Sequence, residues 1–96
     1  MRTAYLVTYD ICEPKRLRRV FRIMRGYGDH LQLSVFRCEL TDVELVELRG
    51  RLAETIHHTQ DQVLFVKIGP IDGRGSTSIS ALGRKYEPPL RGAIVV

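Results

Sequence analysis

The order of hydrophobic patterns along the chain most restricts what it can fold into. Residues 3–11 and 62–68 are rich in β-branched, leucine and aromatic residues and are too short for stable helices, so we predict two strands. Residues 30–40 also have the pattern of extended chain, either one long bent strand or two strands joined by a sharp turn. Two helical patterns separate these three segments.

The first predicted helix begins at Pro14, a residue that fits the first helical position because its missing N–H is not needed there. We expect Gly26 and Gly28 to end this helix. The second helix opens with the capping box TDVE at 41–44. Each helix carries an apolar stripe at helical spacing that must face a sheet, namely Leu17, Val20, Phe21 and Met24 in the first and Leu45, Leu48, Leu52 and Ile56 in the second.

This order matches a ferredoxin-like βαββαβ sandwich, an α+β fold in which both helices cover one face of an antiparallel sheet. In a chain of 96 residues a second copy is the simplest cover for the other face, so we expect a homodimer. Residues 1–70 form the predicted core, and residues 71–96 form a C-terminal extension in which 79–82 could make one helical turn. The apolar end at 93–96 is predicted to be an extra strand that packs on the partner subunit.

The chain is basic, with a formal net charge of +4 and a pI of about 9.4, and 12 of its 15 cations are arginine. The planar guanidinium suits phosphate, so a nucleic-acid partner is favoured. Two cysteines without CxxC spacing give neither a disulfide framework nor a zinc module. No apolar segment approaches the roughly 18 residues of a membrane span, and we expect a soluble, cytoplasmic protein without membrane partners.

Asp10 is a lone carboxylate at the end of the first predicted strand, directly before the basic helix. Its position fits an ordinary turn residue as well as a ligand for a metal that acts on phosphates. A two-fold axis near Asp10 would supply the second carboxylate that tight Mg²⁺ binding needs. Six of the 15 cations lie within residues 15–25, and their density favours phosphate contact over a merely solvated face: Lys15, Arg16, Arg18, Arg19, Arg22 and Arg25.

Other candidate residues have simpler interpretations. His57 and His58 lie in a polar loop without further ligands nearby, so we predict exposure to solvent. Cys12 has no neighbouring base, which favours a small, semi-buried residue over a nucleophile. Tyr9 and Phe36 are predicted to be core or interface aromatics, because the aromatic motif of RNA-recognition modules is absent from the central strands.

Four motifs together resemble the CRISPR-associated protein 2 family: YLVTYDI at 5–11, PKRLRRVF at 14–21, YG at 27–28 and QLSVFRCEL at 32–40. The match in order and spacing covers roughly residues 3–70. The resemblance implies a ferredoxin-like homodimer whose two Asp10 carboxylates lie near the two-fold axis and share one Mg²⁺. It also implies metal-dependent endonuclease activity on single-stranded RNA or on DNA. In spacer acquisition, such a dimer binds duplex DNA and bridges two dimers of the CRISPR integrase.

By position, the resemblance makes Asp10 the metal carboxylate and adds to the catalytic site Tyr9, Arg16, Arg19, Ser34 and Phe36. Leu33 and Cys12 depart from the residues usual in the family, which leaves the substrate preference open. We favour the scaffold role in adaptation over catalysis because no separate general base is visible. The alternative is a free-standing nucleic-acid-binding protein or toxin-like endoribonuclease of the same fold.

Overall fold

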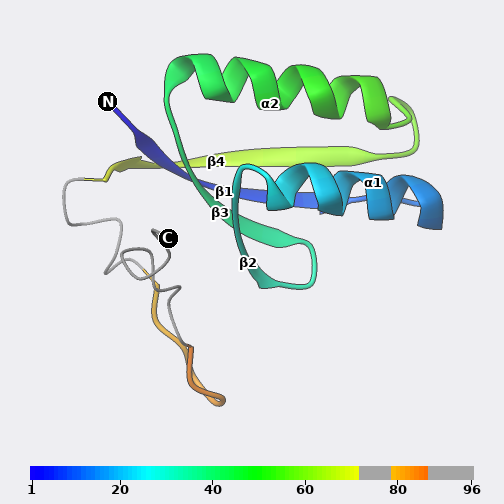
Figure 1. Cartoon of the computed structure of the whole chain (residues 1–96). Coiled ribbons are helices and arrows are strands. Elements are labelled where there is room, and N and C mark those ends of the chain that lie inside the picture. The colour runs from blue at the N-terminus through cyan, green and yellow to red at the C-terminus, as the bar shows by residue number, and fades with distance from the viewer. Residues whose placement is uncertain (72–78, 87–96) are drawn as a thin grey trace, which may run out of the picture.

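Six elements follow one another in the predicted order, as the computed structural model in Figure 1 shows, and the structure describes residues 1–71 and 79–86. Residues 30–40 belong to two strands, with the turn between them at Leu33 and Ser34. The elements are β1 (Thr3–Asp10), α1 (Pro14–Arg25), β2 (Gly28–Gln32), β3 (Val35–Leu40), α2 (Asp42–Thr55) and β4 (Gln62–Pro70).

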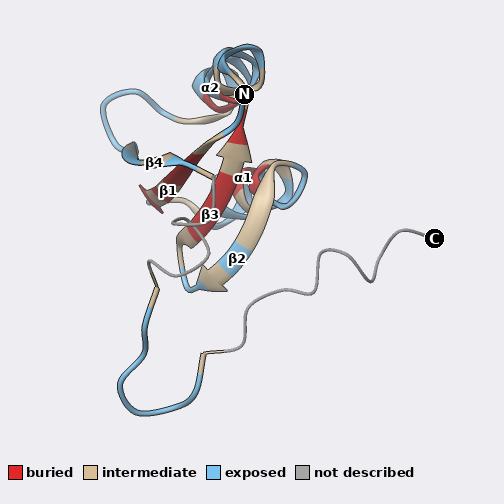
Figure 2. Cartoon of the chain, turned by 90° about the vertical axis from the view of Figure 1, so that its left-hand side faces the viewer, coloured by how far each residue is buried: buried red, intermediate tan, exposed pale blue. Residues whose placement is uncertain are grey.

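The four strands form one antiparallel sheet in the order β2-β3-β1-β4. Figure 2 shows both helices on the same side of this sheet, and no described residue forms a helix on the other face, here called the open face. The predicted ferredoxin-like α+β arrangement is therefore confirmed. Neither α1 nor α2 is long and apolar enough to cross a membrane.

The core lies between the helices and the strand residues that point toward them. Alternation along β1 turns Tyr5, Val7 and Tyr9 inward, and the antiparallel register places Val7 opposite Phe36 of β3. Both predicted helix stripes face this layer, although Leu17 remains 38% exposed. The other buried side chains of the core are Val20 and Met24 of α1, Cys38 and Leu40 of β3, and Leu48 and Leu52 of α2.

Several predicted boundaries are corrected. β1 ends at Asp10, one residue earlier than expected, and α1 ends at Arg25 with Gly26 as its C-cap. Gly28 does not end the helix but begins β2. A Cβ atom at Gly28 would overlap Sγ of Cys38 and lie 2.6 Å from the carbonyl oxygen of Arg37, so close strand packing explains this glycine.

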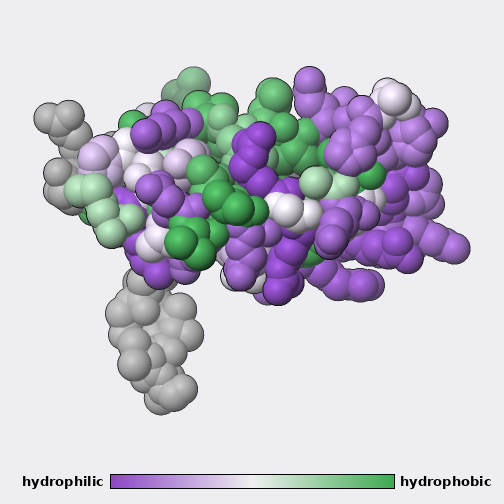
Figure 3. Space-filling view, turned by 90° about the horizontal axis from the view of Figure 1, so that it is seen from above, coloured by the Kyte–Doolittle hydropathy of each residue, from purple (hydrophilic) through white to green (hydrophobic). Residues whose placement is uncertain are grey.

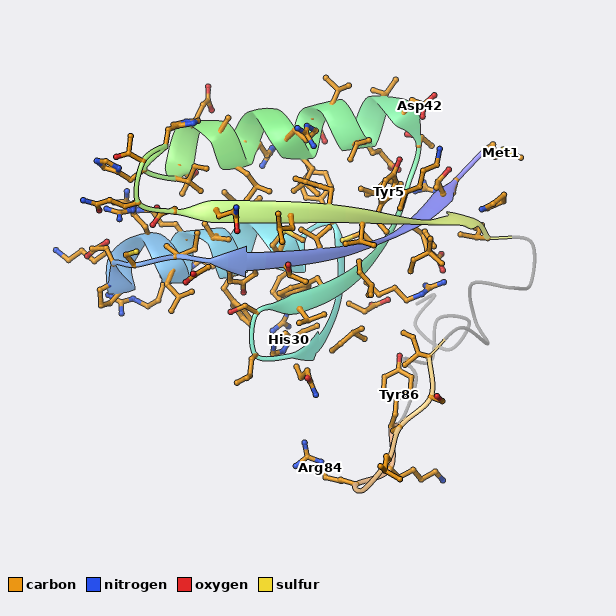
Figure 4. The ribbon with its side chains drawn as sticks, turned by 180° about the vertical axis from the view of Figure 1, so that it is seen from behind. Met1, Tyr5, His30, Asp42, Arg84 and Tyr86 are labelled. Carbon is orange, nitrogen blue, oxygen red and sulfur yellow. The ribbon has the colours of Figure 1, made fainter. Side chains whose placement is uncertain are left out.

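The C-terminal extension has no helix or strand in its described part. Residues 79–86, where Figure 4 labels Arg84 and Tyr86, are irregular chain, so the helical turn suggested for 79–82 is wrong. The predicted terminal strand at 93–96 lies outside the described residues.

Candidate carboxylate site and nucleic-acid interface

Asp10 is the last residue of the central strand β1 and is exposed to solvent. Because side chains alternate along a strand, Tyr9 points toward the helices and Asp10 toward the open face. The backbone N–H of Tyr9 donates to the carbonyl oxygen of Ser34 at 3.1 Å, and Asp10 lies opposite Gln62 of β4. The carboxylate therefore lies at the end of the sheet next to the β2–β3 turn.

The carboxylate of Asp10 is not part of a closed metal site among the residues that the structure describes. Within residues 1–71 and 79–86, no group of three or more His, Cys, Asp or Glu side chains is arranged to hold a metal ion. Mg²⁺ is often bound through one or two carboxylates, with waters and substrate phosphates completing its octahedron. An exposed Asp10 fits that mode of binding only when a second chain or a phosphate contributes further oxygens.

The loop that follows Asp10 is attached to the α2–β4 loop by Asp61, a residue that the sequence pattern did not single out. The Asp61 side chain is fully buried, and its carboxylate accepts hydrogen bonds from Nε of Arg16 at 2.8 Å and from the backbone N–H groups of His57 at 2.7 Å and Cys12 at 2.9 Å. The Arg16 guanidinium, together with the Cys12 and His57 backbone N–H groups, holds the pKa of Asp61 well below its usual range. Arg16 and Asp61 are 45 positions apart, so no local sequence signal could have shown the pair.

Arg16 is consequently tied to protein groups. Its side chain is only 20% exposed, and Nη2 also donates to Oε1 of Gln60 at 3.2 Å. Arg16 is one of the cations predicted to contact phosphate, and in the structure it is bound by a buried carboxylate instead. Its neighbour Cys12 is exposed rather than semi-buried, and the thiol donates to the carbonyl oxygen of Gln60 at 2.9 Å.

The outer face of α1 carries the remaining cations of the predicted interface. Lys15, Arg18, Arg19, Arg22 and Arg25 are all exposed, and no ion pair within the described part of the chain involves any of them. The guanidinium of Arg25 lies over the Phe21 ring at 5.7 Å from its centroid. Figure 3 shows hydrophilic residues crowded at the end of the molecule where α1 begins and α2 ends. We call Arg18, Arg19 and Arg22 the arginine row.

Tyr9 and Phe36 are core residues, as predicted. Their rings stack with centroids 6.2 Å apart, and burial raises the pKa of the Tyr9 phenol. Phe36 is fully buried and has only carbon atoms in its side chain, so its contribution to a site is to support Tyr9. Ser34 lies partly buried in the turn beside them.

The β2–β3 turn has a conformation that the sequence pattern did not predict. Leu33 has a φ of 38°, in the left-handed region that leucine rarely adopts, and its side chain is 87% exposed. Nε2 of His30 lies 2.7 Å from the Leu33 carbonyl oxygen. The His30 ring, at the β2 edge in Figure 4, packs against Phe21 and Phe36. His57 and His58 are exposed, as expected.

Comparisons with known proteins agree on one family. The family model described as CRISPR associated protein Cas2 matches residues 2–72. The CRISPR-associated endoribonuclease Cas2 of Geobacter sulfurreducens is 36% identical over 96 residues, which is 100% of both chains. The CRISPR-associated endoribonuclease Cas2 1 of Rhodospirillum rubrum is 38% identical over 93 residues, covering 97% of this chain and 90% of its own length.

Solved structures show the same likeness. The crystal structure of Streptococcus pyogenes Cas2 at pH 6.5 aligns with a TM-score of 0.74 and 33% identity, covering 83% of this chain and 99% of that one. A hypothetical protein from Thermus thermophilus aligns with a TM-score of 0.76 and 29% identity, covering 93% of this chain and 100% of that one.

Proposed function

The chain belongs to the CRISPR-associated protein Cas2 family, and we propose that it acts as a homodimeric scaffold in CRISPR adaptation. In this role the dimer binds duplex DNA along α1 and bridges dimers of the CRISPR integrase during spacer acquisition. The arginine row is the observation that carries this proposal, because its three guanidinium groups are exposed and no described carboxylate neutralises them. Such groups are available for the phosphates of a DNA backbone.

The open face of the sheet supports the dimer. On β4, Val63 and Phe65 pack toward the core, so alternation turns Leu64 and Val66 to the open face, where each is 49% exposed. Adjacent exposed apolar side chains on a sheet face favour burial against another protein surface. A second copy of the chain would cover them and would bring the two Asp10 side chains, which point to this face, toward one another.

A second candidate function is the endoribonuclease activity that gives the curated relatives their name. A Mg²⁺ ion shared by two Asp10 carboxylates would supply a bound water of lowered pKa and positive charge for a phosphate. The adjacent Tyr9 phenol is a poor general base at neutral pH, since burial raises its pKa further above an ordinary value of 10. The geometry therefore supports the scaffold role better than catalysis.

Asp10→Asn separates the two functions. The amide has the same shape as the carboxylate, and it would relieve repulsion between paired charges, so we expect the dimer to persist and Mg²⁺-dependent cleavage to be lost. In the scaffold role, duplex DNA binding and integrase-dependent spacer acquisition stay close to wild type. The three measurements are cleavage, fluorescence anisotropy with labelled duplex, and acquisition in cells that express the integrase.

Asp42→Asn, an equal change of charge at an exposed position in the first turn of α2, is the matched control. Loss of acquisition in Asp10→Asn with DNA binding preserved would overturn the scaffold proposal and make catalysis the biological role. A change in stability alone, of about 1 kcal/mol or less, would mark Asp10 as a turn residue.

A further inference from the structure

A hollow of about 590 Å³ lies between α1 and the β2–β3 turn, beside the end of β1. Tyr9, which is almost fully buried, lies at its base, and Leu17, Phe21 and Leu33 form apolar walls. The partly buried Ser34 and the exposed Arg18 and Arg22 complete the lining, and the two arginines lie one helical turn apart on α1. The hollow thus combines an apolar interior with positive charge at its mouth.

The conformation of the β2–β3 turn keeps one apolar wall in place. Leu33 adopts a left-handed φ of 38°, which is unfavourable for a leucine, and the hydrogen bond of His30 to its carbonyl oxygen holds the turn. Backbone strain of this kind persists where the surrounding structure maintains it, and it is concentrated at functional sites. Here it presents an exposed leucine next to the hollow instead of burying that leucine in the core.

The combination of walls and charge defines the occupant. A purely apolar partner would leave two arginines at the edge of its contact without counter-charges, whereas a nucleotide places the flat π-face of a base next to an anionic phosphate. We propose that the hollow receives an unpaired base of single-stranded nucleic acid, with the adjoining phosphate paired to Arg18 or Arg22. Leu17, Phe21 and Leu33 contact the base by apolar packing, and this preference for unpaired nucleotides deepens the proposed nucleic-acid function.

The test compares two labelled single strands of equal length and charge, one with bases and one made of abasic sites, by fluorescence anisotropy. The wild-type protein is expected to bind the strand with bases about tenfold more tightly, since the abasic strand offers no base for stacking or apolar packing. Leu33→Asn is expected to abolish that ratio, because asparagine tolerates the left-handed conformation but removes the apolar wall. Arg18→Gln is expected to weaken the binding of both strands by the same factor.

Val46→Asn is the control, since Val46 is an exposed apolar residue of α2 outside the hollow. Equal binding of the two strands by the wild-type protein, or a ratio that survives Leu33→Asn, would overturn the proposal. A dimer that dissociates on Leu33→Asn in light scattering would also overturn it, because the hollow would then belong to a second copy. Binding of duplex DNA, measured in parallel, tests the proposed function separately. If the protein binds duplex DNA but binds the two single strands equally, the proposal for the hollow fails and the proposed function stands.

Discussion

The first turn of α1 and its outer face present the same residue type in two different states. Arg16, in the first turn, is held by the buried carboxylate of Asp61 and is mostly covered. Arg18, Arg19 and Arg22 are exposed and form no ion pair among the residues that the structure describes. The position of one acidic side chain, rather than the identity of the arginines, separates a structural cation from three that are available to a ligand.

The two states have different energetic consequences. A carboxylate removed from water needs charge-assisted hydrogen bonds, and removal of its cation leaves a charge that the interior poorly accommodates. Replacement of an exposed arginine changes the stability of the fold little, because water solvates the charge in the folded and the unfolded chain alike. We therefore expect the arginine row to control binding and Arg16 to control folding.

The largest expected effect is on DNA binding. Replacement of Arg18, Arg19 and Arg22 by glutamate should weaken duplex binding about 100-fold or more at about 0.15 M salt, and the slope of log K against log salt should flatten by about 0.9 for each phosphate that the variant no longer neutralises. The melting temperature should stay close to wild type. Anisotropy titrations over a salt series and thermal unfolding measure both quantities.

An equal change of charge on α2 and β4 provides the control, with glutamate at Arg49, Arg51 and Lys67, which are also exposed. If this control variant loses duplex binding as strongly as the arginine-row variant, net charge and not the α1 surface governs binding.

The next effect is on stability. Arg16→Ala should lower the melting temperature by several degrees, because Asp61 keeps its backbone hydrogen bonds but loses its cation. Arg19→Ala, in contrast, should stay within about 0.5 kcal/mol of wild type. Differential scanning calorimetry of the two variants makes the comparison, and Arg16→Lys, which restores charge without the planar guanidinium, should recover part of the loss. Equal melting temperatures for the two alanine variants would contradict the structural role of Arg16.

The smallest expected effect is on the loss of stability at acid pH. The pKa of Asp61 in the folded chain lies well below its ordinary value of 3.8, so its contribution to stability is present above about pH 4 and is lost progressively as the pH falls below 4 toward the lowered pKa of the folded chain. Asp61→Asn should therefore be less stable than wild type at pH 7 and should lose less stability between pH 5 and about pH 3. Urea unfolding at a series of pH values measures the difference.

Two other carboxyls contribute to the pH dependence of stability in both the wild type and Asp61→Asn. Hydrogen bonds from backbone N–H groups lower the pKa of Glu13, chiefly through Arg16, and that of Glu44, chiefly through Thr41. The test therefore rests on the difference between the two curves. Identical acid limbs would show that Asp61 does not link the two loops through its charge.

Short-range sequence patterns predicted the order of the helices and strands and the fold class, but they left residues 30–40 open between one strand and two and suggested a helical turn at 79–82 that does not form. The capping box at α2 is an example: the Thr41 hydroxyl accepts from the backbone N–H of Glu44 at 3.1 Å, and the Glu44 carboxylate accepts from that of Thr41 at 2.9 Å. Such contacts involve residues three positions apart and form wherever the helix forms. Pro14 at the start of α1 and the apolar stripes that face the sheet are also short-range signals. Together, such signals place Asp10 at a strand end in front of a basic helix.

The tertiary structure alone decided which of these residues are available for function. Asp61 meets Arg16 only because β4 lies beside β1 in the sheet, and the hollow exists only because the β2–β3 turn comes next to α1. Burial, counter-charges and cavities depend on residues that are far apart in the chain. A pattern of neighbouring residue types carries no record of those distances, and for this reason the arginines of α1 look alike in the sequence and differ in the folded protein.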